Sequence, residues 1–254
     1  MPSEAGEAAA RALVGQKWED PDGRLGGGTW RIEHGGVTPH PLGPGPATRI
    51  EMRTAETKGP NLRLVREQLA VSFPITTDGD VAAMLRWLGK PAVAGVAGEA
   101  SANWQLAAAR IEALGPAVHG WRAGLCQRGK PGQIEVVLWN VGGTRAHVTG
   151  RATLTVGATS LPLPMRWPKS KPRQVPTQGE CMLQLEHGSA LYYPADVGGM
   201  LAANGKPALA DGVHELELAL RLDVAEGEAA AELRSKKLQL TVGAAASGKQ
   251  SPGK

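Results

Sequence analysis

Alternating apolar and polar residues mark the C-terminal half of the chain as β-structure. Between His214 and Asp223 every second residue is a leucine, from Leu216 to Leu222, and most of the intervening residues are charged. A period of two is typical of a strand with one buried face and one wet face. Lys237–Val242 repeats the pattern. Because each strand has one apolar face, a second sheet must cover it, and we expect an antiparallel β-sandwich.

Other segments of this half also have strand-like patterns. They are Gln133–Val141, which is apolar enough to be buried, then Ala146–Val156 and Cys181–Glu186. Ala229–Leu233 fits either a strand or a connection. Pro194-Ala195-Asp196 predicts the start of a short helical turn that runs through Ala203.

The first half combines shorter strands with one well-marked helix. Strands are predicted at Thr29–Glu33, Arg49–Thr54, Leu62–Val65 and Gln68–Ile75. Thr77 is followed three residues later by an acid, and apolar residues then recur at helical spacing, so a helix is predicted near 78–89. Residues 101–114 fit either a helix or a strand.

The organisation of the chain follows from its length and its turn-forming residues. A chain of 254 residues favours two domains, and 34 glycines with 19 prolines favour many short strands. We predict an N-terminal tail (1–16) with a short frayed helix, a β-rich region (17–114), a sandwich domain (115–243) and a disordered tail (244–254). The fold class is mainly β, with a C-terminal sandwich preceded by a smaller β-rich region that has one or two helices.

Four segments of the second half carry a resemblance to a known family. They are Val118–Leu125, Ile134–Gly142, Gly212–Leu222 and Glu232–Ser235 leading into Leu238–Val242. Together they resemble the non-catalytic Ig-like sandwich modules of planctomycete-type multidomain proteins, some of which follow a BlaR-type membrane metallopeptidase. The resemblance covers about residues 115–243. It implies that the first segment opens the sandwich, the second ends in an Asn-Val-Gly turn, and the last pair forms a hairpin-like edge. The peptidase motif His-Glu-x-x-His and the spanning helices are absent from the sequence, so no peptidase activity is implied.

Composition adds two expectations. Seven tryptophans against two tyrosines and one phenylalanine predict a tryptophan-centred core. The net charge of +4 is mild, and the densest basic cluster surrounds Trp167 in a proline-containing stretch that reads as an extended loop. Its charged members are Arg166, Lys169, Lys171 and Arg173. We expect an ordinary exposed loop there, and weak polyanion or nucleic-acid binding remains an alternative.

The cysteines and the apolar runs leave the compartment open. Cys126 and Cys181 are too few for a disulfide framework, and we expect isolated buried thiols, although an oxidised pair stays possible. The sequence has no run of 18 apolar residues, so no transmembrane helix is predicted, and the first residues do not resemble a signal peptide. The chain is expected to be cytoplasmic if Met1 is the native start, and extracytoplasmic if it is part of a larger protein.

Candidate chemistry is sparse. The six histidines, His34, His40, His119, His147, His187 and His214, include no pair at zinc-hydrolase spacing. Asp78 and Asp80 lack the later ligands of a calcium loop, and helix capping explains them. Gly26-Gly27-Gly28 lacks the lysine of a phosphate loop, and no Gly-x-Ser-x-Gly is present. The sequence therefore predicts no catalytic, cofactor-binding or metal residue.

Three functions compete on these grounds. The first is a non-catalytic binding or structural module that meets a protein partner, or a second copy, through an edge strand or a tryptophan-bearing face. The second is a hydrolase-type enzyme with a site in residues 17–114 that uses His34, His40 or Asp78. The third is the weak polyanion binder. A pocket that gathers several titratable groups with shifted pKa values favours the enzyme.

Overall fold

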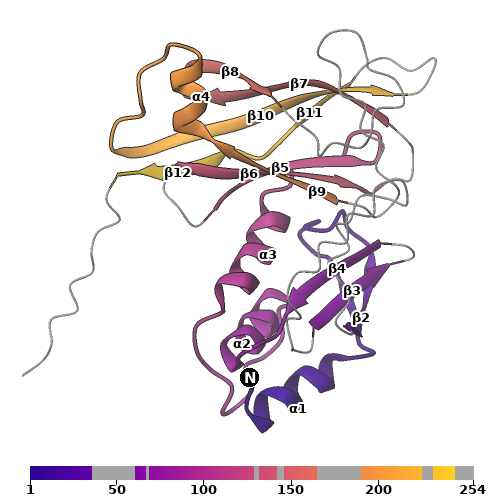
Figure 1. The fold of residues 1–254 in the computed structure, drawn as a ribbon. Helices are drawn as coiled ribbons and strands as arrows, with labels where there is room; N and C mark the ends of the chain where they lie inside the picture. The colour runs from indigo at the N-terminus through magenta and orange to yellow at the C-terminus, as the bar shows by residue number, and fades with distance from the viewer. Residues whose placement is uncertain are drawn as a thin grey trace, which may run out of the picture.

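The computed structural model describes residues 1–35, 61–66, 69–128, 132–141, 146–164, 190–224 and 231–243. Within these residues the chain forms twelve strands and four helices. All the strand pairs are antiparallel. The predicted mainly β class is therefore confirmed. Figure 1 shows a helix-covered sheet in the lower part of the molecule and two further sheets in the upper part.

A four-stranded sheet in the order β1-β2-β3-β4 forms the lower part. Its strands are β1 (Lys17–Glu19), β2 (Thr29–Gly35), β3 (Asn61–Arg66) and β4 (Leu69–Pro74). Trp30 and Ile32 are buried while Arg31 between them is exposed, because successive side chains of a strand point to opposite faces. The buried face contributes to one apolar cluster with the helices α1 (Glu4–Leu13), α2 (Asp78–Trp87) and α3 (Ala102–Glu112). The three helices therefore cover one face of the sheet.

The helices begin where the sequence supplies capping side chains. The hydroxyl of Thr77 accepts a hydrogen bond from the backbone N–H of Asp80, and the carboxylate of Asp80 accepts one from the backbone N–H of Thr77. The predicted helix near 78–89 is therefore confirmed as α2 with a capping box. The segment 101–114, whose pattern was compatible with a helix or a strand, forms helix α3, and Ser101 is its N-cap. The short helix predicted within residues 1–16 is confirmed as α1, but it buries Leu13 in the core and is not a frayed tail.

Tryptophans occupy the interiors of both parts. The six tryptophans within the described residues are all buried, and Trp121 is 0% exposed. In the lower part Phe73 lies between two of them, with ring centroids 5.0 Å from Trp87 and 5.8 Å from Trp104. The predicted tryptophan-centred core is confirmed for this portion of the chain, and Trp167 lies outside it.

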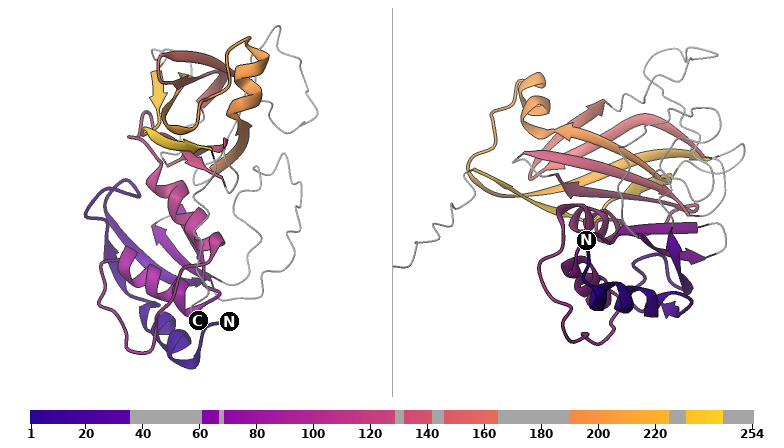
Figure 2. Two further views of the ribbon diagram at one scale, coloured as in Figure 1. Left: turned by 90° about the vertical axis from the view of Figure 1, so that its left-hand side faces the viewer. Right: turned by 60° about the horizontal axis from the view of Figure 1, so that its bottom comes forward.

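Two sheets that share one apolar core form the upper part; we call them the paired sheets. The first has the order β5-β6-β9, and the second has the order β11-β10-β7-β8 with β12 also paired to β10. Their strands are β5 (Trp121–Gln127), β6 (Gln133–Asn140), β7 (Ala146–Val156), β8 (Thr159–Pro164), β9 (Ala190–Asp196), β10 (Gly212–Val224), β11 (Ala231–Arg234) and β12 (Leu238–Val242). Side chains of both sheets and of helix α4 (Val197–Ala203) meet in the core. Figure 2 shows the two layers from the side.

The leucine alternation that predicted the last strands is confirmed. Leu216, Leu218 and Leu220 of β10 are all 0% exposed, as is Leu240 of β12. The predicted hairpin-like edge is wrong, however, because β11 and β12 each pair with β10 and not with each other. Ser235 lies between them and exchanges hydrogen bonds with the backbone of Leu218. The chain therefore continues along β10 without reversing direction.

The sheet β5-β6-β9 lies between two apolar layers. Ile134, Val136 and Leu138 of β6 face the second of the paired sheets, whereas Val137 and Trp139 join the core beneath α3. Helix α3 packs against both β4 and β5, so it connects the lower and upper parts. The predicted boundary at 114 falls in this contact region, and the division into two domains stays a prediction.

The close approach of α3 to β5 requires a glycine. A Cβ atom at Gly124 would lie 2.9 Å from the carbonyl carbon and oxygen of Ala113, closer than side chains tolerate. The backbones of Gly124 and Leu114 also form an isolated antiparallel bridge. Because only a hydrogen occupies this place, the end of α3 can lie directly on the strand.

Several predictions need correction or fall outside the described residues. The predicted helical turn through Ala203 is confirmed as α4, which begins at Val197 with Asp196 as its N-cap, but Pro194–Asp196 also forms the end of strand β9. The strands β1, β8 and β9 were not predicted. The predicted strands at Arg49–Thr54 and Cys181–Glu186, the basic cluster at 166–173 and the C-terminal tail lie outside the described residues. Among the helices that the structure does describe, none is long and apolar enough to cross a membrane.

Candidate functional site

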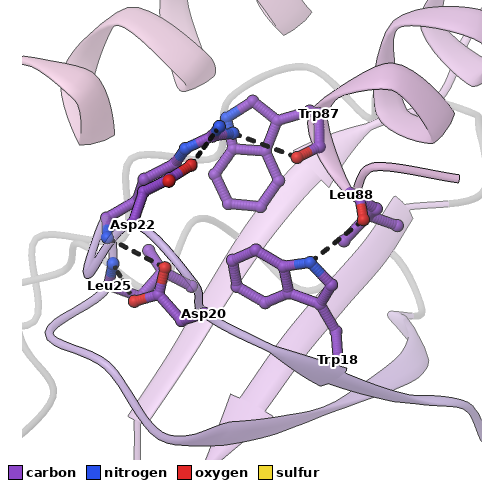
Figure 3. A network of polar contacts seen from close by, with 7 residues as sticks. Trp18, Asp20, Asp22, Leu25, Trp87 and Leu88 are labelled. Carbon is purple, nitrogen blue, oxygen red and sulfur yellow. Dashed lines mark hydrogen bonds and ion pairs between the residues drawn. The ribbon is translucent and has the colours of Figure 1, made fainter.

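A buried carboxylate organises residues 20–28, which we call the 20–28 loop. The carboxylate of Asp20 accepts hydrogen bonds from the backbone N–H groups of Arg24, Leu25 and Gly27 at 2.9, 2.7 and 2.8 Å. Figure 3 shows the loop curled around this side chain. Gly27 has φ of 78°, in the left-handed region that glycine adopts without strain. The glycine run that lacked a phosphate-loop signature therefore serves to fold this loop around Asp20.

The 20–28 loop holds the C-terminal end of α2. Arg24 donates to the carbonyl of Trp87 at 3.0 Å, its guanidinium lies 5.2 Å from the Trp87 ring centroid, and it pairs with Asp22 at 2.7 Å. Trp18 Nε1 donates to the carbonyl of Leu88 at 3.2 Å, as Figure 3 shows. These donors satisfy carbonyls that the last turn of a helix leaves without partners.

Arg122 of β5 joins the same loop to the end of α3. It is 4% exposed, and its guanidinium donates to the carbonyls of Gly115, Arg24 and Leu114 at 2.8, 2.7 and 3.3 Å. Burial lowers the pKa of Arg122, and the nearby charge of Asp20 opposes that shift. Arg122, a residue of the paired sheets, thus connects the 20–28 loop with the segment that follows α3.

A second buried carboxylate fixes the beginnings of α2 and α3. Asp80 is 0% exposed; it accepts hydrogen bonds from the backbone and hydroxyl of Thr76, both at 2.7 Å, from Thr77 N at 3.0 Å and from Ser101 N at 2.6 Å. Burial alone would raise the pKa of Asp80, but the hydrogen bonds from Thr76 and Ser101 outweigh it and hold the pKa below its ordinary value. The nearby Asp78 instead accepts from Ser3 N at 2.9 Å. The capping interpretation of Asp80 is confirmed.

Asp80→Asn is expected to lower the free energy of unfolding at pH 7 by about 2 kcal/mol. The amide NH2 group that replaces one carboxylate oxygen cannot accept the hydrogen bonds that Thr76 or Ser101 donates. A carboxyl whose pKa is lowered by folding contributes stability above its unfolded pKa, and this contribution is lost as the pH falls through the folded pKa. The difference from wild type should therefore narrow below about pH 4. Urea unfolding at pH 7 and pH 3 measures both effects. The exposed Glu112→Gln is the control, and an equal effect of both variants at pH 7 would contradict the assignment.

A buried ion pair joins α3 to the paired sheets; with its neighbours we call it the α3 junction. Arg110 of α3 holds Glu135 of β6 through two hydrogen bonds, Nε to Oε2 at 2.7 Å and Nη2 to Oε1 at 3.1 Å. The Glu135 side chain is 3% exposed, and Arg128 Nη1 lies 3.9 Å away. The guanidinium of Arg110 stacks 3.7 Å from the ring centroid of Tyr192. Cys126 completes the group, with its sulfur 3.9 Å from Glu135 Oε2.

Two side chains of the α3 junction have raised pKa values, and neither shift makes a reactive thiol. Burial raises the pKa of Cys126 to about 12, and the charge of Glu135 adds to the shift. Burial likewise raises the pKa of Tyr192 to about 12. A thiol nucleophile requires a lowered pKa, so this arrangement suits a structural joint instead of covalent catalysis. The prediction of a buried thiol is confirmed for Cys126, and Cys181 lies outside the described residues.

Cys126 is expected to report opening of the α3 junction. In a Cys181→Ser variant at pH 8, an aromatic disulfide reagent should label the native protein roughly a thousandfold more slowly than the urea-unfolded protein, because labelling requires exposure of a buried thiol. The absorbance of the released thiolate measures the rate, and the double variant Cys126→Ser/Cys181→Ser gives the background. Labelling of native protein within a factor of ten of the unfolded rate would contradict the described burial.

The three histidines whose side chains the structure describes lie in different places. His34 is the next-to-last residue of strand β2, His119 lies in the turn before β5, and the ring of His214 is 2.8 Å from the carbonyl oxygen of Ala210. His40 and His187 lie outside the described residues, as does the side chain of His147. Within the described residues no three His, Cys, Asp or Glu side chains form a group that can hold a metal ion.

A small cavity of about 160 Å³ lies between α1 and the lower sheet. Its lining residues are Pro2, Glu7, Ala10, Arg11, His34, Leu62 and Ile75. It brings His34 together with Glu7 and Arg11, whereas Asp78 is not among its lining residues. The predicted enzyme alternative paired neither Glu7 nor Arg11 with His34, since both precede residue 17.

Sequence reasoning missed the groups that hold the parts together. Glu135 and Arg122 are the charged residues within otherwise apolar strands, and this is the signal that could have identified them. A charge inside a buried strand requires a partner. The identity of that partner could not follow, because Arg110 is 25 positions from Glu135 and Arg24 is 98 positions from Arg122.

Comparison of the chain with protein families, with curated proteins and with solved structures found no match.

Proposed function

We propose that this chain is a non-catalytic binding or structural module. The observation that carries the proposal is that the buried charged groups of the described residues form contacts within the protein. Asp20 and Asp80 accept from backbone N–H groups, Arg122 donates to carbonyls, and Arg110 pairs with Glu135. Groups held in this way stabilise a fixed arrangement of α3, the 20–28 loop and the paired sheets. None of these five groups is among the lining residues of the cavity beside α1.

We further propose that the paired sheets form an Ig-like sandwich. In immunoglobulin constant domains the first, second and fifth strands share one sheet, and the third, sixth and seventh share the other. Counting from β5 within the described residues, the same strands share each sheet here, if β11 and β12 together count as the seventh. The fourth strand, β8, lies beside the third instead of in the first sheet. The strand order thus supports the resemblance to Ig-like modules, although the central tryptophan and inter-sheet disulfide of antibody domains have no counterpart in the described strands.

The binding edge that fits this proposal best is β12. The described tryptophans are buried, so a tryptophan-bearing face is not offered by this portion of the chain. Proline interrupts the edge strands β8 and β9, at Pro162 and Pro194, and proline cannot donate to an added strand. β12 contains no proline and pairs with β10 along one side. An extended segment of a protein partner or of a second copy can add to its other side.

Self-association through β12 provides a direct test. Light scattering across a concentration series should show dimers whose dissociation constant rises at least about tenfold in Gln239→Pro, since Gln239 is exposed and its N–H is removed by the substitution. Gln105→Ala, on the exposed face of α3, is the control. Concentration-independent monomers would exclude the second copy as the partner.

The enzyme alternative is tested with chromogenic ester and phosphate substrates. We expect no hydrolysis above buffer that depends on His34 or Asp78. A rate lost in both His34→Gln and Asp78→Asn would overturn the module proposal. The polyanion alternative predicts retention on a heparin column above physiological salt, where screening weakens nonspecific contacts.

A further inference from the structure

The cavity beside α1 has an apolar floor and a charged rim. Ala10, Leu62 and Ile75 form the floor, and Leu62 and Ile75 are 1% and 0% exposed. Glu7, Arg11 and His34 form the rim. The floor and rim come from α1, β2, β3 and the residue after β4, so packing of α1 onto the sheet creates the cavity.

The size of the cavity sets the size of its occupant. At about 160 Å³ it is comparable to the engineered apolar cavity of about 150 Å³ that admits benzene. A single six-membered ring or a short branched chain fits this space.

The rim offers hydrogen-bond donors that the described residues leave unused. Arg11 Nη2 is bonded to Glu7 Oε2 at 3.1 Å, and a guanidinium has further N–H groups. His34 makes no hydrogen bond to any residue that the structure describes. An arginine with free donors and an imidazole above an apolar floor are complementary to a carboxylate that carries an apolar body.

We propose that this cavity binds a small carboxylate with a ring-sized apolar body, whose carboxylate contacts Arg11 and His34. Glu7 competes for Arg11 and therefore weakens binding. The proposal goes beyond the module function, because it stands whether or not β12 meets a partner strand.

Titration calorimetry of the full chain with benzoate tests the charge requirement. We expect saturable binding of benzoate that is at least about fivefold tighter than that of benzyl alcohol or benzylamine. Arg11→Gln should weaken benzoate binding about tenfold, the loss of one charge-assisted contact, and Glu7→Gln should strengthen it. Arg86→Gln, an exposed arginine at the end of α2, is the matched control and should leave the affinity unchanged.

The apolar floor is tested separately with Ala10→Val. Filling the cavity should weaken benzoate and benzyl alcohol alike, whereas Arg11→Gln should affect benzoate alone. Circular dichroism and thermal unfolding establish that each variant is folded, and the exposed position of Arg11 keeps that variant informative if Ala10→Val is unstable. Non-saturable benzoate binding, or equal effects of Arg11→Gln and Arg86→Gln, would overturn the proposal. The β12 experiment is independent of either result.

Discussion

Arg122→Met is expected to lower the free energy of unfolding by about 3 kcal/mol or more. Methionine approximates the volume of the arginine stem but cannot donate to the carbonyls of Gly115, Arg24 and Leu114. A hydrogen bond from a charged group contributes roughly 1.5–3 kcal/mol, and a buried acceptor left without a partner costs a similar amount. Burial of the cation, which lowers its pKa, offsets part of this stabilisation.

Urea unfolding monitored by tryptophan fluorescence measures the effect of Arg122→Met. The control is Arg86→Met, because Arg86 is exposed and should change stability by no more than about 0.5 kcal/mol. Arg122→Lys should give an intermediate loss, since an ammonium retains the charge but cannot reach three carbonyls in the geometry of a guanidinium. Equal stability of Arg122→Met and Arg86→Met would show that the 20–28 loop and α3 are held by packing alone.

Arg110→Met is expected to cost about 3–5 kcal/mol, because it leaves the buried carboxylate of Glu135 without its main partner. Arg128 lies 3.9 Å from the same carboxylate and offers partial compensation. In contrast, the double variant Arg110→Met/Glu135→Leu removes both charges and should recover most of the loss. Replacing a buried ion pair by apolar side chains is often neutral, since the desolvation penalty disappears with the charges.

A double-mutant cycle measured by urea unfolding tests whether the ion pair between Arg110 and Glu135 holds the α3 junction together. A coupling energy of about 2 kcal/mol or more is expected between Arg110 and Glu135. The labelling rate of Cys126 provides a second readout, and Arg110→Met should raise it by loosening α3 from β6. If the two single substitutions are additive and Cys126 stays protected, the ion pair does not hold the junction.

Elements encoded by local patterns were predictable from the sequence. The capping box of Thr77 and Asp80 defines the start of α2, and the alternating leucines define β10 and β12. These signals lie within a few residues of the structure they predict. β8 and β9, which were not predicted, contain prolines, and both are edge strands, where a proline does not break a ladder of hydrogen bonds.

The joints of the molecule depend on tertiary packing. Nothing near Glu135 identifies Arg110, and nothing near Arg122 identifies the carbonyls it binds. The sequence Asp20-Pro21-Asp22-Gly23 is typical of a turn, but the burial of Asp20 arises only when the 20–28 loop folds back over it. Likewise the cavity rim combines Arg11 with His34, and no sequence spacing connects a residue on a helix with one on a later strand.

Burial of the sheet β5-β6-β9 on both faces limits how this chain can evolve by recombination. A gene segment starting at residue 115 would encode the paired sheets without α3, and would release Val137 and Trp139 to solvent and deprive the carboxylate of Glu135 of its main partner. Such a fragment would be prone to aggregation. A transferable cassette would have to begin at or before Ser101, so that the sheets travel with the helix that covers them.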